Sequence, residues 1–107
     1  GVEPAQKGMK VAKYGKSTHL TFGTVVHDKY EVCLPVHQRI ACFENQLVIE
    51  GKNGKFADLG DSGSVIVHIE TKKAIGLLCG KIGSGKTAVA NHLEPMLKRL
   101  HADFGII

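Results

Sequence analysis

Gly60-Asp61-Ser62-Gly63-Ser64-Val65-Ile66-Val67 is the stretch of this sequence that most constrains its fold and its chemistry. Turn-forming residues lead here into a β-branched run, which predicts a strand over residues 63–69. Glycine at position 60 lets the N–H groups of Gly60 and Ser62 point in the same direction. Two such donors can stabilise the oxyanion that forms when a serine hydroxyl attacks a carbonyl carbon. The motif predicts a nucleophilic Ser62, with an ordinary β-turn as the structural alternative.

Short strand-like segments occupy most of the chain on both sides of this motif. Turn residues separate them, and Asn53-Gly54 is the strongest short hairpin signal. The expected strands cover residues 9–14, 20–27, 30–36, 40–43, 46–50, 63–69, 74–79 and 88–90. Strands this short and this closely spaced indicate a small all-β barrel or sandwich.

The C-terminal segment has a different periodicity. Leu93, Met96, Leu97 and Leu100 recur at helical spacing, which predicts one helix. Asn91 is the expected N-cap of this helix, and Pro95 fits its first turn, where a missing N–H costs little. We expect residues 1–107 to form a single domain with a linker-like N-terminus over residues 1–8.

Several stretches, in the right order, resemble the second barrel of chymotrypsin/trypsin-like serine peptidases of fungal and bacterial type. Residues 13–25, KYGKSTHLTFGTV, resemble the start of that barrel, which often reads K-x-G-x-T-T-G-x-T-x-G-x-V. Residues 56–59, FADL, precede the GDSGS motif as a short loop does in that family. Residues 76–80, GLLCG, resemble its substrate-binding strand. The resemblance implies an antiparallel Greek-key β-barrel with a C-terminal helix.

The resemblance also implies roles for individual residues in a trypsin-like serine endopeptidase. Ser62 would be the catalytic nucleophile, and the backbone N–H groups of Gly60 and Ser62 would form the oxyanion hole. The implied substrate-binding residues are Phe56, Leu59, Cys79, Gly80 and Lys81. Phe56 stands where some family members carry an acidic pocket floor, which implies a preference for apolar or small side chains. No metal and no organic cofactor are implied.

The chain departs from the family pattern in three ways. His19 replaces a usual glycine, the disulfides of secreted members are not expected, and the base histidine and orienting aspartate belong to the family's first barrel. His68, six residues beyond Ser62 on a strand, would lie roughly 20 Å away, too far to accept its proton. We therefore expect the partners to be a peptide or protein substrate and an N-terminal barrel that supplies His and Asp. The isolated chain should have negligible peptidase activity.

Two further interpretations remain open. Residues 80–87, GKIGSGKT, satisfy the G-x-x-x-x-G-K-[ST] phosphate-loop pattern, in which Lys86 would contact phosphates and Thr87 would bind Mg²⁺. Pro95 and the antiparallel strand pattern upstream disfavour a nucleotide-binding function. The other interpretation is an inactive peptidase-like barrel that serves as a binding module.

Composition narrows the remaining function classes. The net charge is +4, but the lysines are dispersed, which disfavours nucleic-acid binding as a function. No apolar run is long enough to cross a bilayer, and no signal peptide is apparent. Three cysteines, at positions 33, 42 and 79, argue against a disulfide framework and favour an intracellular protein. The six scattered histidines predict no metal site.

Overall fold

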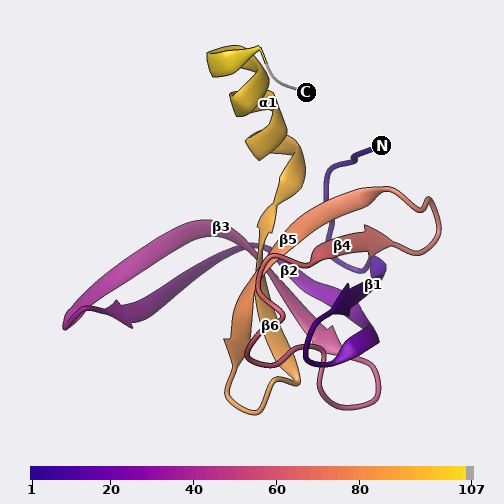
Figure 1. The fold of residues 1–107 in the computed structure, drawn as a ribbon, viewed down its shortest axis with the longest axis vertical. Coiled ribbons are helices and arrows are strands. Elements are labelled where there is room, and N and C mark those ends of the chain that lie inside the picture. The colour runs from indigo at the N-terminus through magenta and orange to yellow at the C-terminus, as the bar shows by residue number, and fades with distance from the viewer. Residues whose placement is uncertain (106–107) are drawn as a thin grey trace.

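The computed structural model describes residues 1–105, apart from the side chains of residues 34 and 36. Their strands form a closed antiparallel barrel in the order β1-β2-β3-β6-β5-β4 (Figure 1). The elements are β1 (Lys10–Gly15), β2 (His19–Val36), β3 (Arg39–Gly51), β4 (Val65–His68), β5 (Ala74–Ile82), β6 (Thr87–His92) and α1 (Leu93–Phe104). Because β4, β5 and β6 are consecutive neighbours and β3 returns to lie beside β6, this is a Greek key. The predicted all-β Greek-key barrel with a C-terminal helix is confirmed.

The barrel interior is filled by alternate residues of the strands. Along β1, Val11 and Lys13 point inward and are buried, whereas Lys10 and Tyr14 are exposed, which is the two-residue period of a strand with one wet face. Pairing of β1 with β4 closes the barrel, with Val11 opposite His68. The largest core side chains are Val11, Val25, Leu47, Ile49, Phe56, Ile66 and Ile75.

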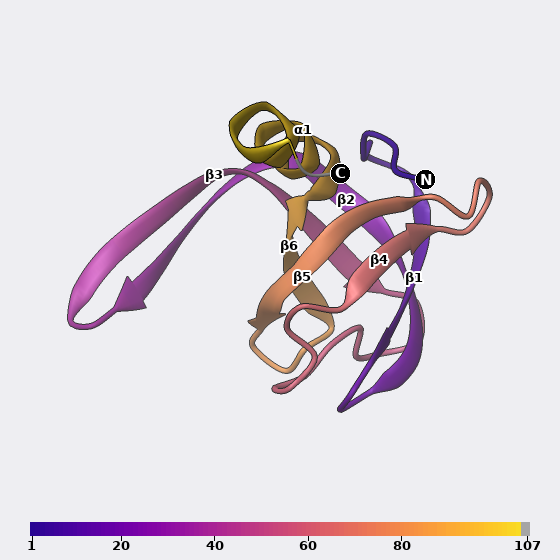
Figure 2. The ribbon, with the colours of Figure 1, turned by 45° about the horizontal axis from the view of Figure 1, so that its top comes forward.

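β2 and β3 extend beyond the barrel as a long two-stranded ribbon, seen to the left in Figures 1 and 2. The sequence predicted two short strands in each of these segments, and this division was wrong. Three register shifts, between Val25 and Val32 on β2, accommodate the extra residues, so the chain continues as one strand. β-Bulges absorb residues that would otherwise interrupt a ladder, and they twist the ribbon.

A disulfide joins Cys33 to Cys42 across this ribbon. The two residues are cross-strand partners in the β2–β3 register. The expectation that this chain carries no disulfide was therefore wrong, because a separation of nine residues becomes a direct contact once a hairpin folds the chain back. This bond also removes one of the two arguments for an intracellular protein. Cys79 is a free cysteine.

Residues 52–64 connect β3 to β4 without forming a strand. The Asn53-Gly54 signal marks a bend, as expected, but the bend does not join a hairpin: β3 pairs with β2 and β6, and the chain crosses to the other side of the barrel. This crossing segment carries the GDSGS motif and delivers it to the start of β4.

The helix begins directly where β6 ends. Its N-cap is His92, without a side-chain capping bond, rather than the expected Asn91. The helix cannot begin earlier, because His92 at the end of β6 still pairs with Gly76 on β5. Asn91 therefore lies inside the β5–β6 ladder. Pro95 is the third helical residue and lies in the first turn, as predicted. No helix within residues 1–105 has both the length and the apolar character required to span a membrane.

The N-terminal residues, expected to be linker-like, contact the barrel. Val2 forms a parallel bridge with Ala74, the N–H of Glu3 donates to the carbonyl oxygen of Ala74 at 3.1 Å, and Ala5 is buried in the core. The Glu3 carboxylate also lies 2.6 Å from Nδ1 of His68. His68 is thus engaged at the end of β4 that lies away from Ser62.

The phosphate-loop pattern at residues 80–87 lies in a β-hairpin. β5 continues to Ile82, a tight turn follows, and Thr87 begins β6, which pairs antiparallel with β5. A phosphate loop needs a helix after the glycines so that the helix N-terminus meets the phosphates. A strand occupies that place here, so the nucleotide-binding interpretation finds no support.

The glycines of this turn have a structural reason instead. The carbonyl oxygen of Gly85 accepts hydrogen bonds from the N–H groups of Phe56 (2.8 Å) and Ala57 (3.2 Å), which fastens the turn to the crossing segment. Gly85 has a φ of 98°, and a Cβ there would overlap the carbonyl oxygen of Ala57. Only glycine satisfies both the backbone conformation and the close approach.

We predict that Gly85→Ala destabilises the chain by about 3 kcal/mol, since it combines an unfavourable φ with displacement of the Ala57 backbone. Gly83→Ala is the matched control: its φ is also positive, at 58°, but a Cβ would meet nothing within 4 Å. We expect the control to cost about 1 kcal/mol. Urea unfolding followed by circular dichroism measures both. Equal losses would contradict the role given to the Ala57 contact.

Candidate functional site

Ser62 is exposed on a turn that two glycines shape. Gly60 has a φ of 97° and Gly63 a φ of 91°, values that favour glycine. A side chain at Gly60 would also overlap the hydroxyl of Ser17. On its far side the turn is fastened to β5, because the Gly63 N–H donates to the Leu78 carbonyl (2.8 Å) and the Leu78 N–H to the Ser64 carbonyl (2.9 Å). The position of Ser62 is thus set by backbone bonds.

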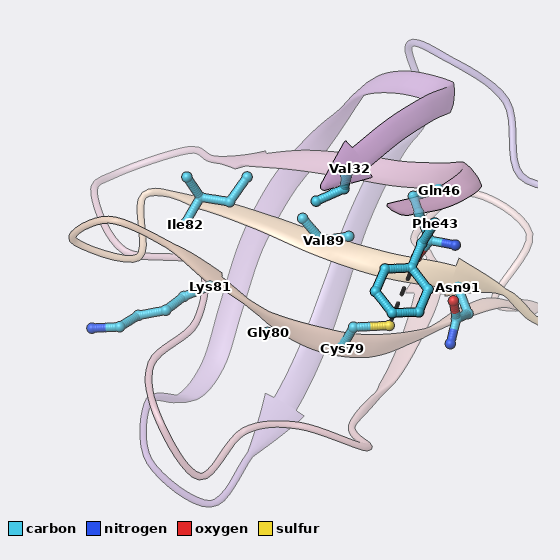
Figure 3. A pocket seen from close by; sticks show the side chains of 9 residues that line it. All are labelled: Val32, Phe43, Gln46, Cys79, Gly80, Lys81, Ile82, Val89 and Asn91. Atoms are coloured by element: carbon cyan, nitrogen blue, oxygen red, sulfur yellow. Dashed lines mark hydrogen bonds between the residues drawn. The ribbon is translucent and has the colours of Figure 1, made fainter. Parts of the chain in front are cut away.

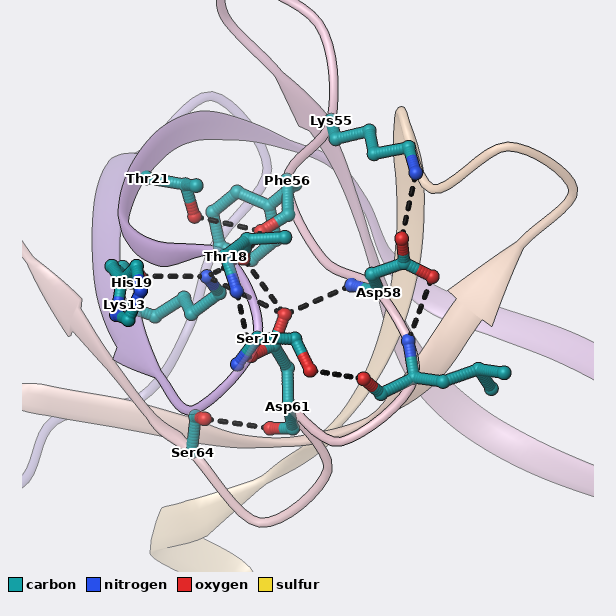
Figure 4. Close-up of polar contacts among 11 residues, drawn as sticks. Lys13, Ser17, Thr18, His19, Thr21, Lys55, Phe56, Asp58, Asp61 and Ser64 are labelled. Atoms are coloured by element: carbon teal, nitrogen blue, oxygen red, sulfur yellow. Dashed lines mark hydrogen bonds and ion pairs between the residues drawn. The ribbon is translucent and has the colours of Figure 1, made fainter.

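Asp61 anchors this turn from the inside of the barrel. Its fully buried carboxylate accepts hydrogen bonds from three backbone N–H groups, those of Ser17 (2.7 Å), Thr18 (3.2 Å) and Asp58 (2.9 Å). It also accepts one from the Thr18 hydroxyl at 2.7 Å (Figure 4). These donors come from the β1–β2 turn and from the crossing segment, so one carboxylate ties the two together.

Lys13 supplies the countercharge. Its Nζ lies 3.8 Å from Oδ2 of Asp61, and neither side chain is exposed to solvent. Nζ also donates to the Thr18 hydroxyl and to the His19 carbonyl, so this buried cation has two hydrogen bonds besides the ion pair. Burial lowers the pKa of Lys13, while the Asp61 carboxylate opposes that effect. Lys13 therefore compensates a charge that would otherwise be costly inside the barrel.

The pKa of Asp61 reflects the balance between burial and hydrogen bonding. Burial alone would raise it, but the bonds from Asp58, Thr18 and Ser17 outweigh burial and hold the pKa at about 2, below the ordinary 3.8. Asp61 is ionised at neutral pH. Since its pKa is lower in the folded chain than in the unfolded one, ionised Asp61 stabilises the fold, and that contribution disappears as the pH falls through this range.

A second ion-pair cluster lies on the outer face of the crossing segment. The Asp58 carboxylate pairs with Nζ of Lys55 (2.6 Å) and with Nζ of Lys81 on β5 (2.9 Å). Hydrogen bonds from Lys55, then from Lys81 and from the Leu59 N–H, lower the pKa of Asp58 well below its usual range. Lys81 is thereby drawn toward the nucleophile loop. The Ser17 hydroxyl completes the attachment by donating to the Leu59 carbonyl.

The Ser62 hydroxyl and the nearby N–H groups differ in their hydrogen bonding. The Ser62 hydroxyl donates to the Cys79 carbonyl at 2.7 Å. Within residues 1–105, neither the Gly60 N–H nor the Ser62 N–H donates to a protein acceptor. No histidine among these residues forms a hydrogen bond with Ser62. Two free N–H groups therefore accompany an exposed hydroxyl that has no base beside it.

The residues expected to bind substrate separate into two groups. Cys79, Gly80 and Lys81 line a cavity along β5, close to Ser62, and Leu59 is 78% exposed. Phe56, expected at the floor of a specificity pocket, is instead fully buried in the barrel core, with its ring 5.7 Å from Nζ of Lys13. That expectation was wrong for the side chain, because the crossing segment turns Phe56 inward to fill the barrel.

Sequence reasoning missed two contributors to the site. One is Lys13, whose signal is its inward position in the alternating pattern of β1, where a lysine is unusual and needs a buried partner. The other is the ribbon pair Val32 and Phe43, which line the same cavity as Cys79. Nothing in the sequence predicts that contact, because it depends on how far the ribbon extends and which way it twists.

His19 occupies the position where the resemblance suggested glycine. Its φ is 56°, so the backbone conformation that glycine favours is retained despite the side chain. The ring of His19 lies against Tyr14, with 5.6 Å between ring centroids. The turn therefore still presents the Ser17 and Thr18 N–H groups to Asp61.

Comparison with known proteins identifies the fold. No protein-family model matches the chain, and no curated protein matches it either. Among solved structures, the chain is similar to Cellulomonas bogoriensis chymotrypsin, with a TM-score of 0.74 and 22% identity over 92% of this chain and 50% of that one. It is also similar to Thermobifida fusca protease A, with a TM-score of 0.75 and 21% identity over 94% and 50% of the two chains.

A third similar structure is a glutamic acid-specific serine protease described as using a histidine triad in substrate binding. Its TM-score is 0.70, at 20% identity over 92% of this chain and 49% of that one. The chain thus spans about half the length of the solved structures that it matches. At these identities the likeness establishes the fold: the chain has the architecture of the second barrel of chymotrypsin-like serine proteases.

We predict that Asp61→Asn destabilises the chain by about 3 kcal/mol at pH 7, because it leaves Lys13 uncompensated and turns an amide toward N–H donors. The wild-type chain should also lose stability as the pH falls from about 4 to 2, a loss that the variant should show less. Urea unfolding at a series of pH values measures both effects. Asp103→Asn on the helix surface, beside Arg99, is the control and should change little. An unchanged pH slope in Asp61→Asn would contradict the anchoring role.

Proposed function

We propose that this chain is the C-terminal half of a serine endopeptidase in which Ser62 is the nucleophile. The observation that carries the proposal is the turn itself: an exposed Ser62 hydroxyl, two N–H groups without protein acceptors, and a buried Asp61 that holds them in place. The second-barrel fold of chymotrypsin-like serine proteases supports the same reading. An ordinary β-turn needs neither a buried ionised anchor nor a pair of free donors.

The proposed mechanism follows from these groups. Ser62 attacks the carbonyl carbon of the scissile peptide while a base takes its proton, and the resulting oxyanion accepts hydrogen bonds from the Gly60 and Ser62 N–H groups. The base gives this proton to the leaving amine as the tetrahedral intermediate collapses to an acyl-serine, and water, deprotonated by the same base, then hydrolyses the ester and releases Ser62. Before attack, the Ser62 hydroxyl must exchange its bond to the Cys79 carbonyl for one to the base.

The base and its orienting carboxylate would come from an N-terminal barrel. This partner is part of the proposal, because a serine hydroxyl is a weak nucleophile until a neighbouring group accepts its proton. The half-length match to two-barrel neighbours supports such a partner. The substrate would be a peptide or protein segment that approaches along β5, next to Cys79, Gly80 and Lys81.

We expect a fluorophosphonate probe to label Ser62 in the longest natural form of the protein that includes an N-terminal barrel, and not in the 107-residue chain, which lacks a base. Gel fluorescence and peptide mass spectrometry locate the label. Ser62→Ala should abolish labelling. Ser84→Ala, which removes an exposed hydroxyl from the β5–β6 turn, is the matched control and should retain it.

Two results would contradict this proposal. Absence of labelling in the longer form would indicate a barrel without catalytic function, which acts only by binding. Labelling of the 107-residue chain at Ser62, at a rate equal to that of the longer form, would show that the base lies within this barrel.

A further inference from the structure

The end of the β2–β3 ribbon stands clear of the rest of the barrel (Figures 1 and 2). β1 pairs with β2 only up to Thr24, and β6 pairs with β3 only from Leu47 onward. Among the strands of residues 1–105, residues 39–44 of β3 therefore have β2 on one side and no strand on the other. We call this side of residues 39–44 the open edge. A strand edge of this kind offers unpaired backbone groups to another strand.

The Cys33–Cys42 pair shows which backbone groups face the open edge. Its Cα atoms are 4.0 Å apart, which is the close spacing of a non-hydrogen-bonded pair, since hydrogen-bonded pairs are about 5.5 Å apart. In a non-hydrogen-bonded pair, the N–H and C=O groups of both residues point away from the partner strand. Ile40 has the same orientation as Cys42, because it lies two residues along the same ladder. The open edge therefore presents the N–H and C=O groups of Ile40 and Cys42.

The two outer edges of the ribbon differ in what they offer. On β2, the residue paired with Ile40 is Pro35, which has no N–H and so interrupts the outer edge of β2. Lys29 and Glu31 add charge to the same strand. Proline and charge are common means by which an edge strand avoids pairing. The open edge of β3 has neither from Ile40 to Phe43, so it is the edge that can accept another strand.

Apolar side chains accompany the free backbone groups. Ile40 is 70% exposed, and Pro35 and both cysteines of the disulfide are exposed as well. These side chains share one face of the ribbon, because residues two apart on a strand point the same way. The opposite face carries Phe43, which lies over Cys79 of the barrel (Figure 3). The face away from the barrel thus has two exposed apolar elements side by side, Ile40 with Pro35 and the disulfide.

The strand that fits the open edge is the open edge of a second copy. Two copies related by a two-fold axis use the same surface, and their edge strands pair antiparallel. An axis at Ala41 sets Ile40 of each copy opposite the partner's Cys42, so the free N–H and C=O groups meet. Ile40 then also lies against the partner's disulfide, and each apolar element covers the other. Antiparallel pairing leaves the two barrels at opposite ends of the joined sheet.

The charges of the open edge support the same arrangement. Arg39 stands at its start and Glu44 at its end. Antiparallel pairing about Ala41 places Arg39 opposite the partner's Phe43, where a cation and an aromatic ring attract each other, and near the partner's Glu44. Parallel pairing would instead bring like charges together. The regular stretch ends before Asn45, whose φ is 57°, so this register uses all of the extended backbone.

We propose that the open edge of β3 pairs antiparallel with the open edge of a second copy of this chain, so that two ribbons form one four-stranded sheet. The proposal goes beyond the peptidase function and does not rest on it, because no residue of the Ser62 turn takes part. Stable interfaces bury more than roughly 1,000 Å², which exceeds what a pair of five-residue strand segments covers. The dimer is therefore weak, and its population depends on concentration.

Sedimentation velocity of the 107-residue chain, from roughly 10 μM to 1 mM, should show a monomer that becomes a dimer. Ile40→Lys replaces the apolar contact by charge, and Ile40→Pro removes an N–H that the ribbon itself does not use. Each should raise the dissociation constant roughly tenfold or more. Leu20→Lys is the matched control: it adds the same charge at an apolar residue, 56% exposed, at the barrel end of β2, and should associate as the wild type does.

Amide hydrogen exchange, followed by NMR at the two ends of this concentration range, locates the contact. The N–H groups of Ile40 and Cys42 should exchange rapidly in the monomer and slowly in the dimer. The N–H groups of Ala41 and Phe43 bond within the ribbon and should exchange at the same rate at both concentrations. Cys33 is an internal control, because its N–H faces the outer edge of β2 and should exchange rapidly throughout.

Three results would overturn the proposal. The first is a chain that stays monomeric over the whole range. The second is a dimer in which the exchange of Ile40 and Cys42 does not slow, or slows no more than that of Cys33. The third is a loss of association in Leu20→Lys equal to that in Ile40→Lys, because the contact would then lie on another surface. None of these results bears on fluorophosphonate labelling of Ser62, so the two proposals can fail independently.

Discussion

The buried ion pair between Lys13 and Asp61 is the constraint on which the candidate site depends. The carboxylate of Asp61 collects donors from the β1–β2 turn and from the segment that crosses the barrel, and Lys13 compensates its charge from the wall of the barrel itself. A buried pair of this kind contributes less to stability than to geometry, because desolvation offsets much of its attraction. Its structural effect is that the residue before Ser62 is attached to both the β1–β2 turn and the crossing segment.

Around this pair, each neighbouring element approaches the crossing segment from a different direction. The β5–β6 turn contacts it through the carbonyl of Gly85, and Lys81 reaches it from β5 through Asp58. β5 also holds the end of the segment, through the bonds that Gly63 and Ser64 form with Leu78. A loop of 13 residues, from 52 to 64, is thereby as well supported as a strand, although it contains no regular structure. Its position is set by backbone hydrogen bonds to Gly85 and Leu78 and by the ion pair with Lys81.

Local signals in the sequence, alternation along strands and the glycines beside the serine, were sufficient for a small all-β fold and for a turn at Ser62, and the family resemblance added the barrel topology. It was insufficient wherever a residue's environment is set by distant parts of the chain. Phe56 was expected at the floor of a specificity pocket near the nucleophile, yet the crossing segment turns it into the core. Cys33 and Cys42 read as isolated thiols until the length of the ribbon is known. Gly85 matches the second glycine of a phosphate-loop pattern because close backbone contact, like phosphate binding, requires the absence of a side chain.

The sequence separation within the anchor has a consequence for folding. Ser17 and Asp61 are 44 residues apart, and barrel closure joins β1 to β4 across a similar distance. Contacts of this kind form late, since the entropy of closing the loop must be overcome before they stabilise the chain. The hydrogen bonds that hold the serine turn therefore exist only where the β1–β2 turn and the crossing segment have met. The conformation of the turn is thus a product of the tertiary fold, and not of its local sequence alone.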